Sequence, residues 1–117
     1  MASTGLNGPY DLTAEKIDEI ITKTSPGTYA LDRSGDKNTF YVYRVGRSDK
    51  DVNSRLKQYL DSKYTRFMFG YNSSARAAFE KECELYHDFK PPDNTIHPDR
   101  PEGTNYDCPI AECDALQ

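Results

Sequence analysis

Apolar residues return every three or four positions in three stretches of this chain, which is the spacing of an amphipathic helix. Start and stop signals accompany them: Thr13 can cap the first helix, the sequence NSS at 72–74 precedes the third, and the prolines of PPDN at 91–94 end it. The pattern predicts helices at residues 13–23, 49–61 and 75–89.

Between these helices lie three runs of aromatic and β-branched residues that are typical of strands. TYAL and TFYVYRV flank a loop of turn-forming residues, DRSGDKN, so they predict a β-hairpin. YTRFMFGY predicts a third, buried strand. The three runs cover residues 28–31, 39–45 and 64–71. The predicted fold is therefore α+β, with a small mixed or antiparallel three-stranded sheet and flanking helices in the order α-β-β-α-β-α.

The domain organisation follows from the same pattern and from the length of 117 residues, which suits one domain with a modest core. Residues 1–25 are expected to be an N-terminal extension that is loose up to residue 12 and then carries the short helix. Residues 26–94 form the predicted domain. Residues 95–117 are rich in proline, glycine and aspartate without any period, which indicates an irregular acidic C-terminal segment.

The composition is that of a soluble protein, with a mean hydropathy of −0.86 and 29% charged residues. No apolar run approaches the length of a membrane span, and the first residues, MASTGLNGPYD, lack the apolar stretch of a signal peptide. Three cysteines, an odd number, do not indicate a secreted disulfide framework. These features predict a cytoplasmic location and no membrane partner.

The formal net charge of −4 is distributed unevenly along the chain. Residues 1–43 carry a net charge of −2, residues 44–76 one of +5, and residues 77–117 one of −7. A basic block of this kind attracts phosphate groups locally even in an acidic protein. A solvated face with compensating ends explains the same distribution, so both interpretations stay open.

Packing alone does not explain three positions. Glu82 falls inside the apolar stripe of the third helix, where a carboxylate is costly unless it is paired, protonated or bound to a cation. Arg55 borders the apolar stripe of the second helix. Gly46 ends a strand with Arg47 beside it, as expected where a backbone approaches an anion closely. Each also has a simpler explanation: a snorkelling edge residue, an exposed arginine and a plain turn.

Taken together, these residues resemble the GIY-YIG nuclease family. GTY at 27–29 is similar to the first signature of the family, and RVG at 44–46 is similar to the second. Arg55 matches the family's helix arginine, Glu82 matches its metal-binding glutamate, and Asn94 matches a later asparagine that follows a proline. Each triplet is weakly specific by itself, whereas the ordered set is more so.

The resemblance covers residues 26–94, and its element order, β-β-α-β-α, agrees with the predicted one. The main departure is Arg44, which stands where the second signature normally begins with tyrosine. The neighbouring Tyr43 cannot take that place without a bulge, because successive strand side chains point to opposite faces. Arg44 therefore either offers a cation where a phenol is usual or marks an incomplete catalytic set.

The family implies phosphodiester hydrolysis with one divalent cation, and we expect Mg²⁺. Glu82 is expected to coordinate the metal, Arg55 to bind the phosphate, and Tyr29 to orient or deprotonate the attacking water. These three are the candidate catalytic residues. The implied partner is nucleic acid, with DNA first. The candidate substrate-binding residues are Arg44, Gly46, Arg47, Tyr59 and Asn94.

A structural Zn²⁺ site is a separate hypothesis. Cys83 and His87 are four residues apart, on one face of the third helix and away from its apolar stripe. The C-terminal segment adds His97, Cys108 and Cys113, so three cysteines and a histidine could hold zinc and pin this segment to the helix. The gap in CPIAEC differs from the two-residue gap of zinc knuckles. A small buried cysteine, a surface histidine and unligated thiols are therefore the alternative.

Three functions follow from these patterns. The first is a GIY-YIG-type endonuclease that binds nucleic acid and hydrolyses it with Mg²⁺. The second is a catalytically degenerate relative that only binds DNA or RNA. The third is a protein-interaction module that uses the acidic C-terminal segment.

Overall fold

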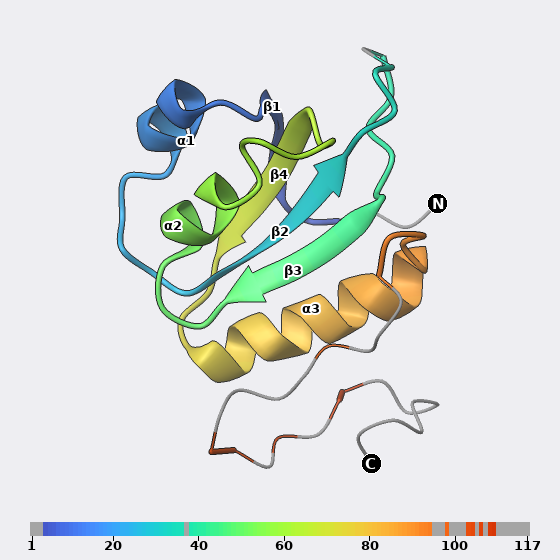
Figure 1. The fold of residues 1–117 in the computed structure, drawn as a ribbon. Coiled ribbons are helices and arrows are strands. Elements are labelled where there is room, and N and C mark those ends of the chain that lie inside the picture. The colour runs from blue at the N-terminus through green and yellow to red at the C-terminus, as the bar shows by residue number, and fades with distance from the viewer. Residues whose placement is uncertain are drawn as a thin grey trace.

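A computed structural model of the chain describes residues 4–36, 38–94, 98, 103, 104, 106, 108 and 109. Within these residues the chain forms a four-stranded antiparallel sheet and three helices (Figure 1), so the predicted α+β class is confirmed. In chain order the elements are β1 (Asn7–Asp11), α1 (Ala14–Ile20), β2 (Gly27–Asp32), β3 (Arg44–Ser48), α2 (Val52–Lys57), β4 (Arg66–Tyr71) and α3 (Ala75–Phe89).

The strands lie in the order β1-β4-β2-β3, and each neighbouring pair is antiparallel. Side chains alternate between the two faces of the sheet. Tyr29 and Leu31 of β2 join the core beneath α1 and α2, whereas Ala30 packs with Leu85 of α3. Figure 1 accordingly shows α1 and α2 on one side of the sheet and α3 along the other. The edge strand β3 contacts both α2 and α3, so residues from all three can meet there.

The N-terminal segment belongs to the sheet, which corrects the expectation of a loose extension. β1 pairs with β4, with Tyr10 opposite Phe67, and Leu12, Ile17 and Ile21 join the hydrophobic core. Four of the five β1 residues are exposed, so this strand has no apolar alternation that would reveal it in the sequence. The sheet therefore has four strands rather than three, and the order of elements begins with a strand.

The predicted hairpin is present, but its second strand lies later in the chain than expected. Residues 39–43 are not a strand, because the partner strand β2 ends at Asp32. The amide of Tyr43 still bonds the carbonyl of Leu31 at 2.9 Å, just before regular pairing begins. β3 then continues to Ser48, which places the RVG sequence and the following arginine inside the strand.

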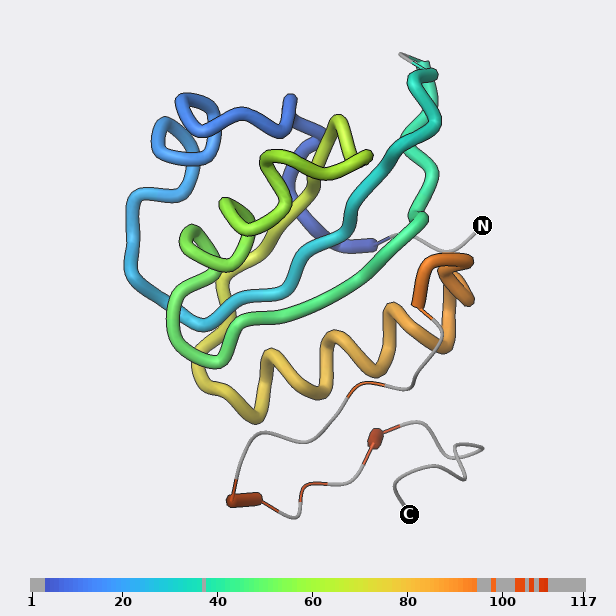
Figure 2. Tube along the Cα trace, viewed as in Figure 1, coloured from blue at the N-terminus to red at the C-terminus, as the bar shows by residue number. Residues whose placement is uncertain are grey.

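The described residues of the connection between the hairpin strands, 33–36 and 38–43, run out beyond the strand ends (Figure 2). Arg66 of β4 holds the two ends of this connection together. It donates to the carbonyl of Thr39 at 2.6 Å and to the carboxylate of Asp32 at 2.5 Å. Asp32 is fully buried. Burial opposes its ionisation, but hydrogen bonds from Ser34 and Arg66 outweigh this and lower the pKa of Asp32. The buried ion pair therefore fixes where the hairpin opens.

The helix boundaries agree best for α3, which spans the predicted residues 75–89 and is capped by Ser74. α2 is shorter than predicted. It begins after the N-cap Asp51, and beyond Lys57 the chain tightens into turns such as Tyr59 N–H to Leu56 C=O at 3.0 Å. None of the helices in the described part of the chain has the length and apolarity that crossing a bilayer requires.

Candidate functional site

A cavity of about 490 Å³, here called the edge-strand cavity, lies beside β3 where α2 and α3 approach it. It brings together every residue that the sequence suggested for catalysis or substrate binding. These residues are Tyr29, Arg44, Gly46, Arg47, Arg55, Tyr59, Glu82 and Asn94. The rest of the lining is Val45, Ser48, Asp49, Lys50 and Pro98. Side chains from β2, β3, α2 and α3 thus meet in one place.

Gly46 shapes this cavity because Tyr29 lies across it. The two residues face each other in the β2–β3 register. A Cβ atom at Gly46 would lie 2.3 Å from the Tyr29 hydroxyl oxygen and 2.4 Å from its Cζ atom, closer than any side chain can approach. Gly46 thus lies inside β3 and not at a strand end as expected, and the close approach of the Tyr29 phenol explains why no side chain stands there.

Two phenols and an arginine form a hydrogen-bonded chain in the cavity. The hydroxyl groups of Tyr29 and Tyr59 are 2.9 Å apart, and Arg44 Nε donates to the Tyr59 hydroxyl at 3.2 Å. Arg44 Nη1 also donates to the backbone carbonyl of Asp93 at 3.2 Å. Arg44, the departure from the family signature, therefore takes part in the same phenol network as Tyr29.

The Tyr29 phenol stays protonated at neutral pH. Its side chain is buried, and burial raises its pKa well above the ordinary value of a tyrosine. The neighbouring Tyr59 raises the pKa further, whereas the Arg55 guanidinium lowers it by less. In this geometry Tyr29 can orient a water or a phosphate by hydrogen bonding, but it is a weak candidate for removing a proton.

Glu82 has the burial that the sequence suggested, and it has a partner. Arg47 Nη1 donates to Glu82 Oε1 at 2.7 Å, and Arg47 Nε donates to Asp49 Oδ1 at 2.8 Å. The side chains of Arg47 and Glu82 are only 11% and 9% exposed, and the guanidinium also lies 5.2 Å from the centre of the Phe79 ring. Burial raises the pKa of Glu82, and Arg47 opposes this shift. One arginine thus bridges the two acidic groups of the cavity.

Arg55 lies on the opposite wall, on α2. Arg55 is exposed, which agrees with the alternative of a surface arginine. Its guanidinium nevertheless reaches the Tyr29 phenol. This interaction raises the pKa of Arg55, with burial acting in the opposite direction. Its Nη1 atom also donates to Gln58 Oε1 at 3.3 Å.

Asn94 lines the cavity, but its amide extends the sheet. Its Oδ1 accepts from the backbone amide of Val45 at 2.8 Å, and its Nδ2 donates to the Val45 carbonyl at 3.0 Å. Figure 2 shows the chain turning back after α3 toward the start of β3, where these bonds form. Both polar atoms of the side chain are engaged, so Asn94 positions the segment after α3 against β3, and its contact with substrate stays a prediction.

Asp93, which the sequence did not single out, anchors this returning segment. Its carboxylate accepts from Arg33 Nε at 2.9 Å and from the Tyr64 hydroxyl at 2.9 Å. Its amide donates to the carbonyl of Tyr43 at 2.9 Å. The hydrogen bond from Arg33 contributes most to lowering the pKa of Asp93 to about 2.

The zinc hypothesis is tested only in part. Cys83 of α3 and Cys108 are both buried and belong to one small apolar cluster with Phe79, so the C-terminal segment does reach α3. His87 instead lines a second cavity of about 300 Å³. His97 and Cys113 lie outside the described residues. Among the residues that the structure describes, no group of three or more acidic, histidine or cysteine side chains could hold a metal, so the zinc site stays a prediction.

None of the other five lining residues was a site candidate in the sequence, and three of them are charged or come from the C-terminal segment. Asp49 and Lys50 follow Arg47 closely, and their place in the basic block was the only signal for them. Pro98 is buried and comes from the C-terminal segment, where hydrophobic residues show no periodic spacing. Its position shows that part of this segment borders the edge-strand cavity.

No protein-family model, curated protein or solved structure matches this chain. Its function is therefore inferred from the residues of the edge-strand cavity and their geometry.

Proposed function

We propose that the protein is a GIY-YIG-type nuclease domain that binds nucleic acid in the edge-strand cavity and hydrolyses a phosphodiester with Mg²⁺. One observation carries the proposal: Glu82, Arg55 and Tyr29 come from three different elements and line a single cavity. The observed element order β2-β3-α2-β4-α3 also agrees with the order that the resemblance implies.

The donor chemistry of the cavity suits Mg²⁺. This ion prefers oxygen ligands and is commonly held by one or two carboxylates together with waters and phosphate oxygens. Glu82 and Asp49 both line the cavity, and Arg47 contacts one oxygen of each. No hydrogen bond to Glu82 Oε2 is found among the described residues, so this oxygen can bind a metal, and Asp49 can contribute a second oxygen. A bound Mg²⁺ would stabilise negative charge on the leaving oxygen.

The remaining roles belong to the side chains of the chain itself. Arg55 binds a non-bridging oxygen of the scissile phosphate and stabilises the charge that builds up in the transition state. Tyr29, as a neutral phenol, orients the attacking water and leaves its deprotonation to another group. Arg44 holds the Tyr59 hydroxyl beside Tyr29 and offers its remaining donors to the substrate backbone.

A second candidate is a domain that binds nucleic acid without cutting it. The observation that favours it is the ion pair between Arg47 and Glu82, because it occupies the proposed metal ligand with a cation of the protein. In this case Arg44 and Arg55 still bind the phosphate groups of the nucleic acid, whereas Glu82 and its partner Arg47 have a structural role.

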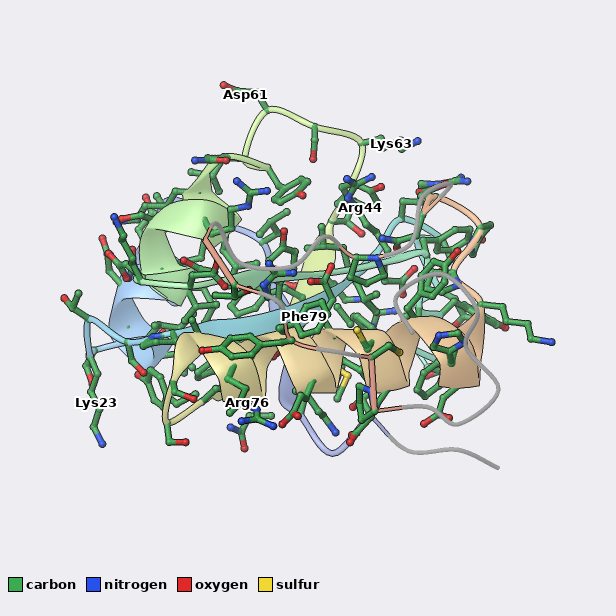
Figure 3. The ribbon with its side chains drawn as sticks, turned by 90° about the horizontal axis from the view of Figure 1, so that it is seen from below. Lys23, Arg44, Asp61, Lys63, Arg76 and Phe79 are labelled. Atoms are coloured by element: carbon green, nitrogen blue, oxygen red, sulfur yellow. The ribbon has the colours of Figure 1, made fainter. Side chains whose placement is uncertain are left out.

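Hydrolysis of a labelled DNA duplex in Mg²⁺ separates the two candidates. We expect cleavage by the wild type and a loss of about 100-fold or more in Glu82→Gln and in Arg55→Ala. Arg76→Gln is the matched control, because the Arg76 side chain is 64% exposed and lies on the far side of α3 from Arg44 (Figure 3). Salt-sensitive binding without any cleavage would favour the second candidate. Equal cleavage by all four proteins would reveal a contaminant and refute the nuclease.

A further inference from the structure

The arginines of the edge-strand cavity differ in how their charge is balanced. Arg47 has two carboxylate partners, whereas Arg44 and Arg55 have none within ion-pair distance among the residues that the structure describes. With Lys50, the lining holds four cationic and two acidic side chains, a net charge of +2. The half-buried Arg44 and the exposed Arg55 are thus two cations without a carboxylate partner in the described part of the chain. Such a pair favours an anionic ligand.

The phenols between these arginines add a hydrogen-bond donor. Tyr29 and Tyr59 together carry two hydroxyl protons, but the bond between them at 2.9 Å uses only one. Arg44 Nε already donates to the Tyr59 oxygen, so that contact uses no phenol proton. Among the described residues, no acceptor is found for the second proton. An acceptor oxygen of a ligand would complete the network.

We propose that Arg44, Arg55 and the Tyr29–Tyr59 hydroxyl pair form a metal-independent site for the terminal phosphate monoester of a nucleic-acid strand. The inference rests on the proposed function and names its substrate class. A phosphate monoester carries a charge of about −1.5 to −2 at neutral pH, whereas each internal phosphodiester carries about −1. The monoester therefore matches the two uncompensated guanidinium groups and the net charge of the cavity.

The wall beside β3 also favours a strand end. Asn94 is bonded to both backbone groups of Val45, and Arg44 is tied to the carbonyl of Asp93. Asn94 and the buried Pro98 both line the cavity, Asn94 at the side next to the start of β3. A strand that ends in the cavity needs only one exit, and the exposed Lys50 lies on the other side, just after the end of β3.

Binding of two otherwise identical fluorescent single strands, one with a 5′-phosphate and one with a 5′-hydroxyl, tests this inference. The titrations are followed by fluorescence anisotropy in EDTA at fixed salt, so that neither metal nor cleavage contributes. We expect the phosphorylated strand to bind roughly tenfold more tightly, because it gains a charge-assisted contact with arginine. Excess inorganic phosphate should reduce this ratio toward one, since it occupies the same donors. Equal affinity of the two strands, or a ratio that phosphate leaves unchanged, would overturn the inference.

Variants assign the preference to the cavity. Arg44→Gln and Tyr59→Phe should each reduce the ratio of the two strand affinities. Tyr59→Phe removes only a hydroxyl group and keeps the ring, so it tests the site even if Arg44→Gln does not fold. Arg76→Gln should retain the full ratio. A preference that survives both cavity variants, or that disappears in Arg76→Gln, would place the phosphate elsewhere and refute the site. The result is separate from the nuclease proposal, because a failure of Mg²⁺-dependent cleavage leaves a ratio measured in EDTA unchanged, and equal strand affinities leave cleavage unchanged.

Discussion

The hydroxyl group of Tyr29 occupies the space that a side chain at position 46 would need. A Cβ atom at Gly46 would lie 2.3 Å from this hydroxyl oxygen and 2.9 Å from the Tyr29 Cε1 atom. The glycine is therefore a requirement of the phenol network, because it lets Tyr29 reach across the edge strand to Tyr59. The Tyr29–Tyr59 bond and the approach to Arg44 both depend on this close contact.

Gly46→Ala is expected to lower the free energy of unfolding by about 1–3 kcal/mol, the usual cost of overpacking a filled site. The added methyl group must displace a buried ring, and the hydroxyl group would leave Tyr59. Urea unfolding of the wild type and the variant measures the loss. A double-mutant cycle with Tyr29→Leu provides the control, since a shorter side chain removes the clash. A cost that is the same in both backgrounds would show that the methyl group clashes with something other than Tyr29.

Asn94→Asp should weaken the edge of β3 without removing volume. The substitution loses the donor to the Val45 carbonyl and places a carboxylate oxygen beside that carbonyl oxygen. We expect a loss of about 1–2 kcal/mol in local stability, measured as faster hydrogen exchange of the Val45 amide. The exposed Asn38 is the matched position, and Asn38→Asp should leave this amide unchanged. Unchanged protection in Asn94→Asp would mean that the segment after α3 does not hold the strand.

Asp93 is expected to make the stability of the folded protein depend on pH in the acidic range. Because its folded-state pKa is lowered from 3.8 to about 2, its contribution is present at neutral pH and is lost as the pH falls through this range. Asp93→Asn should therefore be less stable than the wild type at neutral pH, and the difference should shrink toward pH 2. Urea titrations across the range measure it. Asp61, which is exposed in the α2–β4 connection and points outward in Figure 3, provides the control substitution Asp61→Asn. A difference that is constant with pH would contradict the assigned ion pair.

The sequence predicts α3 well because local signals suffice. A capping serine, Ser74, and a proline just beyond the end enclose fifteen residues with one apolar stripe. β1 gives no such signal, since it is mostly exposed and exists through its pairing with β4. The sequence places the second hairpin strand too early because TFYVYRV has strand-like residues throughout, whereas the length of β2 decides where pairing begins.

Some features of the candidate site could likewise be predicted from the sequence, and others could not. Glu82 stands out in the sequence because a carboxylate interrupts an apolar stripe, and the structure does bury it. Its partner Arg47 cannot be identified from the sequence, because the pair joins β3 to α3 and forms only when they pack together. The Tyr29–Tyr59 bond likewise joins β2 to the turn after α2. Residue types could be predicted, whereas pairings that depend on tertiary packing could not.

The Arg47–Glu82 pair is expected to contribute to stability in an asymmetric way. Both side chains are largely buried, so removing only the arginine leaves an uncompensated carboxylate. Arg47→Gln should then cost about 3–5 kcal/mol at neutral pH in the absence of metal, and the double variant with Glu82→Gln should recover much of the loss. Denaturant unfolding in EDTA measures the cycle. The exposed pair Arg76–Glu80, 3.5 Å apart, provides the comparison, and Arg76→Gln should change stability by less than about 0.5 kcal/mol.

Arg47 and a divalent cation should compete for Glu82, which follows from the proposed function. Arg47 Nη1 contacts the carboxylate at 2.7 Å, so a metal that uses Glu82 must bind beside this cation or displace it. We expect Arg47→Gln to tighten Mn²⁺ binding by roughly tenfold and Glu82→Gln to abolish it. Paramagnetic broadening of amide resonances near residue 82, followed during a Mn²⁺ titration, reports binding without any need for activity. Asp49→Asn should weaken binding only if Asp49 supplies the second oxygen. Equal Mn²⁺ affinity in the wild type and in Glu82→Gln would remove the metal from this cavity and leave the binding-only function as the better explanation.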